Sequence, residues 1–180
     1  RIQKMLNKTF IYVTHDQVEA MTMATKICIM NEGKILQIGT PKEIYESPKN
    51  IFVANFLANP VNNIYKTKIK YQDSFIYLDI FDVKFKTSKG FDDLNEVSIA
   101  IRPEHIYIKE RQHSFKVSGK LEIVENLGHE KILCVRTIKS DKLFYLRVSS
   151  EHIVNVGENI DIYIDENKLL FFDPNNEYLI

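Results

Sequence analysis

Two kinds of hydrophobic pattern divide the chain. Residues 1–58 alternate between helix-like and strand-like periods, whereas residues 61–180 contain many short strand-like runs and almost no helical period. The pattern changes near Asn59-Pro60, so we predict one domain over residues 1–58 and a second over residues 59–180. Alternating elements are typical of α/β folds, and a series of short strands is typical of a β-barrel or sandwich.

The first domain is predicted to hold a strand followed at once by a helix. The continuous apolar run Thr9–Val13 is typical of a strand that is buried on both faces. Asp16 can cap the helix that follows, and Glu19 can reach back to the cap amide. His15 would then lie at the carboxyl end of the strand, where ligands collect in open α/β sheets. The predicted buried stripe of the helix is Val18, Met21 and Ala24 or Thr25.

A hairpin and two short helices are predicted in the rest of the first domain. Apolar runs flank Asn31-Glu32-Gly33, in which the glycine can supply a positive φ angle. Thr40 is expected to cap a helix that has proline in its first turn, with Glu43 completing a capping box. Apolar positions between Ile51 and Leu57 predict a further helix. The hairpin strands are expected at Ile27–Met30 and Lys34–Ile38.

The second domain is predicted to be all-β. Gly90, Gly119, Gly128 and Gly157 are expected at or near turns between its strands. Such short strands favour a small barrel or sandwich, because closure or sheet packing protects strand edges. The predicted strands are 64–71, 75–80, 83–86, 97–101, 115–124, 131–138, 142–148, 160–164 and 168–172.

The charge balance argues against a nucleic-acid partner. Lys and Arg number 24 and Asp and Glu number 24, so the formal net charge is zero and no long-range field attracts a polyanion. The 9 tyrosines and 11 phenylalanines are therefore expected in the core and not as stacking platforms for bases.

Cysteine usage and the absence of long apolar runs predict a cytoplasmic chain. Cys28 and Cys134 lie far apart within apolar runs, as expected of reduced thiols. No apolar run approaches the roughly 20 residues needed to cross a bilayer, and no leader pattern occurs. The chain starts with Arg1 inside a helical pattern formed by Ile2, Met5 and Leu6, so we expect further sequence before it.

Pattern alone leaves the role of His15 open. A histidine at a strand end can be a hydrogen-bonded packing residue or a ligand contact, and the capping role of Asp16 fully accounts for that residue.

The segment around His15 resembles a motif of a known family. Val13-Thr14-His15-Asp16-Gln17, with Glu19 and Ala20, is similar to the switch-histidine segment of ABC transporter ATPases of the importer branch. His129 departs from the family, since relatives often carry asparagine there. Further segments resemble the family in the same order: Asn31–Ile35, Gly39–Pro41 with Glu43–Tyr45 and Pro48, Phe52–Leu57, and, for the accessory β-domain of maltose-type importers, Ile101–His105 and Ile123–Gly128.

The resemblance, which spans essentially the whole chain, implies a fold and a function. Residues 1–58 would be an α/β remnant of the nucleotide-binding domain, and residues 59–180 an OB-like regulatory barrel of the TOBE type. His15 would be the catalytic-site residue that hydrogen-bonds the γ-phosphate of ATP. The complete subunit would bind ATP and Mg²⁺, form a homodimer, and drive a membrane permease from the cytoplasmic face, with regulatory proteins as further partners. The solute would be a carbohydrate or glycerol phosphate, although polyamine, iron and thiosulfate importers share this architecture.

The remaining ATP-site motifs of the family do not occur in the chain. No two of the six glycines have the Walker A spacing followed by Lys-Ser or Lys-Thr, and none are adjacent as in the signature loop. The Walker B strand is expected before Arg1. We therefore predict that the complete subunit is an ATPase but that this chain alone is not, and that it holds no tightly bound cofactor. The histidines and cysteines lack metal-ligand spacing, so we predict no bound metal.

Alternatives to these interpretations are few. Arg102-Pro103-Glu104-His105 could form a catalytic cluster, but a turn is favoured, in which proline stops one strand, Arg102 and Glu104 form pairs, and His105 begins the next strand. The β-domain could instead be a stand-alone module that binds a small oxyanion or a regulatory protein. An OB-type nucleic-acid binder is the second rival, and zero net charge argues against it.

Overall fold

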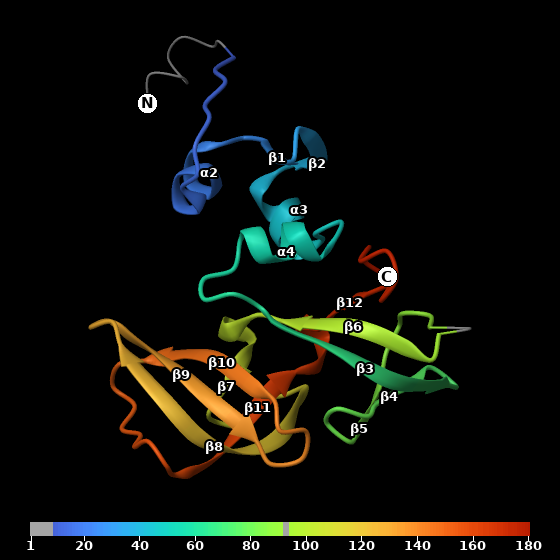
Figure 1. The fold of residues 1–180 in the computed structure, drawn as a ribbon, viewed down its shortest axis with the longest axis vertical. Coiled ribbons are helices and arrows are strands. Elements are labelled where there is room, and N and C mark those ends of the chain that lie inside the picture. Colours follow the sequence, from blue (N-terminus) through green and yellow to red (C-terminus); the bar gives the residue numbers. More distant parts are fainter. Residues whose placement is uncertain (1–8, 92–93) are drawn as a thin grey trace. The chain divides into compact units, whose positions relative to one another are not determined.

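The structure, a computed structural model, describes residues 9–91 and 94–180 (Figure 1). The predicted helix around Ile2 and Leu6 lies outside these residues. The chain divides into two compact units, the first ending at Ser47 and the second running from Pro48 to Ile180. The last helix before the β-rich region thus belongs to the second unit, and the division at residues 58 and 59 stays a prediction.

Within residues 9–47, the first unit contains two short helices and a hairpin. Helix α2 spans Gln17–Met23, strands β1 (Ile27–Asn31) and β2 (Lys34–Gly39) pair antiparallel, and helix α3 spans Pro41–Glu46. Both turn residues of the hairpin, Glu32 and Gly33, have positive φ angles of 48° and 75°, as a type I′ turn requires. The predicted hairpin is confirmed.

The predicted capping box of α3 is also confirmed. The hydroxyl of Thr40 accepts a hydrogen bond from the backbone N–H of Glu43 at 3.2 Å, and the Glu43 carboxylate accepts one from the backbone N–H of Thr40 at 2.7 Å. Each residue therefore satisfies an amide that the helix itself leaves without a partner.

The predicted buried strand at Thr9–Val13 is wrong. These residues have no strand structure, and the side chains of Ile11 and Val13 are 92% and 91% exposed. A strand needs neighbours for its hydrogen bonds, and the strands described in the first unit, β1 and β2, pair with each other. His15 consequently does not lie at the end of a strand in this structure.

The second unit opens with helix α4 (Ile51–Phe56), which confirms the predicted helix, and continues as two five-stranded antiparallel sheets (Figure 1). Short 3-10 helices lie at Pro103–His105 (η1) and Glu166–Lys168 (η2). The first sheet has the order β10 (Leu143–Ser149), β9 (Glu130–Thr137), β8 (Ser114–Asn126), β11 (Asn159–Asp165) and β7 (Ile106–Tyr107). The second has the order β12 (Leu170–Phe172), β6 (Glu96–Ile101), β3 (Asn63–Gln72), β4 (Phe75–Leu78) and β5 (Val83–Lys86).

One hydrophobic core is shared by the two sheets. Strand β10 illustrates the alternation, because Phe144, Leu146 and Val148 are buried while the residues between them are partly exposed. Phe81 packs against both Phe115 and Phe144, with ring centroids 5.2 Å and 5.6 Å apart. These rings confirm that much of the aromatic content is core, in a nearly closed all-β barrel.

Two details of the barrel differ from the sequence predictions. Gly119 lies inside β8 and not at a turn, whereas Gly128 and Gly157 lie in turns with φ angles of 87° and 93°. His105 ends η1, and the next strand, β7, begins at Ile106. With only two residues, β7 is too short to produce an alternating pattern.

Helix α4 covers part of the outer face of the second sheet. Ala54 of the helix packs with Ala100 and Phe172, and Ile64 of β3 joins this cluster. No helix within residues 9–91 and 94–180 is long and apolar enough to cross a membrane.

Candidate functional site

Asp16 caps helix α2, as predicted. Its Oδ1 atom accepts hydrogen bonds from the backbone N–H groups of Val18 at 2.7 Å and Glu19 at 3.1 Å. Two of the amides that the first turn leaves without intrahelical partners are thereby satisfied, which fixes the start of the helix at Gln17, two residues after His15.

The predicted bond from Glu19 back to the cap amide is wrong. The backbone N–H of Asp16 donates to the Thr14 hydroxyl at 3.0 Å instead. Glu19 Oε2 accepts hydrogen bonds from the hydroxyls of Thr14 at 2.8 Å and Tyr12 at 3.2 Å, and the bond to Glu19 raises the pKa of Tyr12. A threonine hydroxyl two residues before the amide reaches it more directly than a carboxylate in the helix, so Glu19 is left to hold the approaching chain.

The predicted buried stripe of α2 is also wrong, because no residue of the helix is buried and Val18 is 71% exposed. An amphipathic pattern shows that a face is suited to burial, not that an element is present to cover it.

His15 lies between these two anchored neighbours. Its side chain is exposed and has no hydrogen bond or ion pair to any residue that the structure describes. Thr14 and Asp16 restrain the backbone on either side, so the imidazole is presented to solvent from a defined loop. A neutral imidazole offers one N–H donor, which suits a single hydrogen bond to a phosphate oxygen.

Comparison with known proteins gives the context of this segment. The chain is 33% identical to the sn-glycerol-3-phosphate import ATP-binding protein UgpC of Psychromonas ingrahamii, over 96% of the chain and 46% of the relative. It is 35% identical to the oligosaccharides import ATP-binding protein MsmX of Bacillus subtilis, over 100% of the chain and 51% of the relative. It is 37% identical to the trehalose/maltose import ATP-binding protein MalK of Thermococcus litoralis, over 96% and 49%.

The TOBE domain family matches residues 99–172. The second unit contains a TOBE domain. The homologues of the chain are ATP-binding subunits of ABC-type sugar importers, as the motifs predicted, and the chain spans about half the length of these relatives. Among solved structures, the molybdate-binding protein ModG is similar to the chain, with 12% identity and a TM-score of 0.49. The match covers 62% of this chain and 96% of the ModG chain.

The segment Arg102–His105 lies within the TOBE domain and forms a largely buried turn. The Arg102 side chain is 2% exposed, and the backbone N–H of His105 donates to the Arg102 carbonyl at 2.9 Å. Burial lowers the pKa of His105, whose Nδ1 atom is buried without a hydrogen-bond partner. This geometry matches the predicted turn, not a solvent-facing catalytic cluster.

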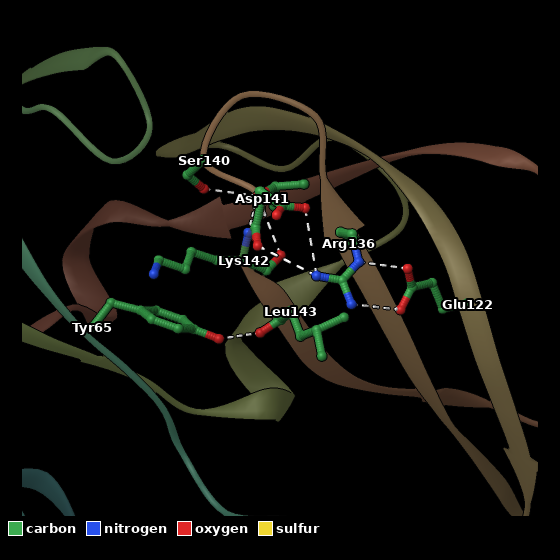
Figure 2. A network of polar contacts seen from close by, with 8 residues as sticks. Tyr65, Glu122, Arg136, Ser140, Asp141, Lys142 and Leu143 are labelled. Atoms are coloured by element: carbon green, nitrogen blue, oxygen red, sulfur yellow. Dashed lines mark hydrogen bonds and ion pairs between the residues drawn. The ribbon is translucent and has the colours of Figure 1, made fainter.

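Two ion-pair networks in the β-rich unit were missed from sequence. The guanidinium of Arg136 bonds both carboxylate oxygens of Glu122, at 2.5 Å and 3.2 Å, and also contacts Asp141 (Figure 2). Arg147 makes a similar bidentate contact with Glu130 at 2.9 Å and 2.8 Å. Glu122 lies at the register shift between Leu121 and Ile123. A bulge changes which side chains meet across strands, so strand alternation could not reveal the first pair.

A depression between β5 and η2 is small. It measures about 130 Å³ and is lined by Lys86, Glu166 and Phe171 among others, whereas small-molecule sites usually exceed roughly 300 Å³. Among the residues described, no group of three or more metal-ligating side chains is close enough to hold a metal.

Proposed function

We propose that the chain is part of the ATP-hydrolysing subunit of an ABC importer for a carbohydrate or glycerol phosphate. The observation that carries the proposal is that relatives named as import ATP-binding proteins match it over 96% to 100% of its length. Their printed names cover glycerol phosphate, oligosaccharides, and trehalose with maltose, which supports a solute of this class.

Within that subunit, His15 contacts the γ-phosphate of ATP. Three features support this role: exposure of the side chain, the absence of a partner among the described residues, and the anchoring by Thr14 and Asp16. The imidazole N–H donates to a phosphate oxygen as charge on it changes during transfer, so its contribution falls mainly on the rate and little on ground-state affinity.

ATP with Mg²⁺, when bound to the complete subunit, supplies the transferable phosphoryl group and neutralises its charge. His15 is the residue of this chain that we assign to the nucleotide. The sequence lacks the Walker A spacing, so the phosphate cradle is assigned to other parts of the subunit.

The β-rich unit serves dimer contact and regulation, and the subunit works at the cytoplasmic face of the membrane through its permease. The TOBE domain supports a regulatory role, and the importer relatives support the permease partner.

The test is His15→Ala in the complete subunit. We expect ATP affinity to stay nearly unchanged and hydrolysis to fall at least about 100-fold, since one well-placed donor is worth roughly 2.7 to 4 kcal/mol of barrier in comparable sites. ATP affinity, turnover and melting temperature are measured on one preparation. His152→Ala is the control, because the His152 side chain makes no hydrogen bond to a described residue. Near-normal turnover in His15→Ala would remove His15 from the functional residues.

A further inference from the structure

The outer face of strands β3, β4 and β5 carries lysines around two aromatic rings. Strand pairing sets Lys70 opposite Tyr77, and Tyr77 opposite Lys84, in one row across the sheet. In the next row, Phe75 lies opposite Lys86. Directly opposed side chains are roughly 5 Å apart at Cβ, so the three lysines surround the two rings closely. We name Lys70, Phe75, Tyr77, Lys84 and Lys86 the lysine face.

The charges of the lysine face are not compensated within the described residues. Lys70, Lys84 and Lys86 are exposed, and none forms an ion pair with any residue of 9–91 or 94–180. The nearby carboxylate of Asp82 forms an ion pair with Lys139 and accepts a hydrogen bond from the Tyr77 hydroxyl at 2.7 Å. Three exposed lysines therefore lie together without an ion-pair partner among the described residues, although the whole chain has zero net charge.

Two neighbouring lysines on the same side of the sheet have different surroundings. Lys68 has Glu96 of β6 opposite it in the strand pairing, and the backbone N–H of Asp79 donates to the Lys68 carbonyl at 3.1 Å. Lys66 donates to the Pro174 carbonyl at 3.2 Å. Lys70, Lys84 and Lys86 thus have no acidic residue opposite them in the strand pairing, and they lie away from the part of this outer face that α4 covers around Ala100 and Ile64.

We propose that the lysine face is a docking surface for an acidic segment of a partner protein. Charge complementarity selects an anionic partner, and the Phe75 ring, whose residue is 38% exposed, supplies an apolar contact beside the lysines. A single-stranded nucleic acid fits less well, because bases need free ring faces. Here the Lys84 ammonium lies over the Phe75 ring, 4.9 Å from the ring centroid.

The experiment measures binding of a labelled peptide of glutamate and glycine to the full chain by fluorescence anisotropy, at about 0.01 M and 0.15 M salt. The variant K70E/K84E/K86E should bind the peptide about tenfold more weakly than the unmodified chain at low salt. The control variant K109E/K120E/K142E changes net charge equally at exposed lysines elsewhere in the second unit and should bind nearly as well as the unmodified chain. Circular dichroism of both variants establishes that each is folded.

Three results would overturn the proposal. Equal weakening in both triple variants would show that net charge alone attracts the peptide. Absence of measurable peptide binding at low salt would show that the face does not capture acidic segments. Tighter binding of an oligothymidylate of equal formal charge, lost in K70E/K84E/K86E, would assign the face to nucleic acid.

Discussion

The side-chain amide of Asn63 exchanges two hydrogen bonds with the backbone of Tyr145, as a neighbouring strand residue would. Its Oδ1 accepts from the Tyr145 N–H at 2.7 Å, and its Nδ2 donates to the Tyr145 carbonyl at 2.9 Å and to the Ile101 carbonyl at 3.1 Å. Asn63 is in β3 and Tyr145 in β10, the edge strand of the other sheet. One side chain therefore links the two sheets, between which the described residues form no strand pairing.

Tyr65, two residues along β3, makes a further contact between β3 and β10. Its hydroxyl donates to the Leu143 carbonyl of β10 (Figure 2), and burial raises the pKa of Tyr65 to about 12. The hydroxyl thus stays protonated, and able to donate, throughout the physiological pH range.

The first prediction is that Asn63→Ala destabilises the second unit by about 2 to 3 kcal/mol. The substitution leaves the Tyr145 N–H and carbonyl without their partner, and an unsatisfied buried polar group costs about 1 to 3 kcal/mol. Urea unfolding measures the change. Asn167→Ala, at an exposed position, is the matched control and should stay within about 0.5 kcal/mol of the unmodified chain. Equal stability of the two variants would show that the contact between Asn63 and Tyr145 does not stabilise the second unit.

A second prediction separates two reasons for glycine. A Cβ at Gly119 would lie 2.4 Å from Val135 Cγ1 and 2.7 Å from the Arg136 carbonyl oxygen, whereas a Cβ at Gly128 would meet no atom within 4 Å. We expect Gly119→Ala to cost about 1 to 3 kcal/mol through crowding of β9. Gly128→Ala should cost about 1 kcal/mol, through its positive φ angle alone. Chemical unfolding of both variants tests this, and a harmless Gly119→Ala would contradict the close approach of β8 and β9.

The third prediction concerns pH. Burial lowers the pKa of His105 below its usual value of 6.5, so the unfolded chain protonates first as the pH falls. Stability should therefore decrease on acidification through pH 6.5, and this contribution should level off below the folded-state pKa. His105→Gln should weaken the pH dependence between about pH 7.5 and 5.5, measured by urea unfolding. His152→Gln should leave it in place. An unchanged slope in His105→Gln would show that His105 does not protonate differently in the two states.

The fourth prediction is that the 180-residue chain by itself does not hydrolyse ATP. The sequence contains no Walker A spacing and no adjacent glycines for a signature loop, so one imidazole would have to act without a phosphate cradle. Phosphate release is measured with and without magnesium, with the complete subunit as the positive control. A magnesium-dependent rate above background that survives purification to homogeneity would refute this prediction.

The sequence by itself determined the elements whose signals are local. The turn at Glu32-Gly33, the Thr40–Glu43 capping box, the Asp16 cap and the main strands of the barrel depend on residues close together in the chain. The motif around His15 and the order of the further motifs, all present in the sequence, were sufficient to predict the family. The role of His15 itself stays a prediction.

Only the tertiary structure decided which surfaces meet. Thr9–Val13 reads as a buried strand, yet it is exposed, because burial requires partner strands that a local pattern does not contain. The Asn63–Tyr145 and Arg136–Glu122 contacts depend on register, a bulge and the approach of two sheets, all of which join residues distant in sequence. Gly119 was predicted at or near a turn because the sequence shows a residue without a side chain. The sequence does not show that strand β9 packs closely against it.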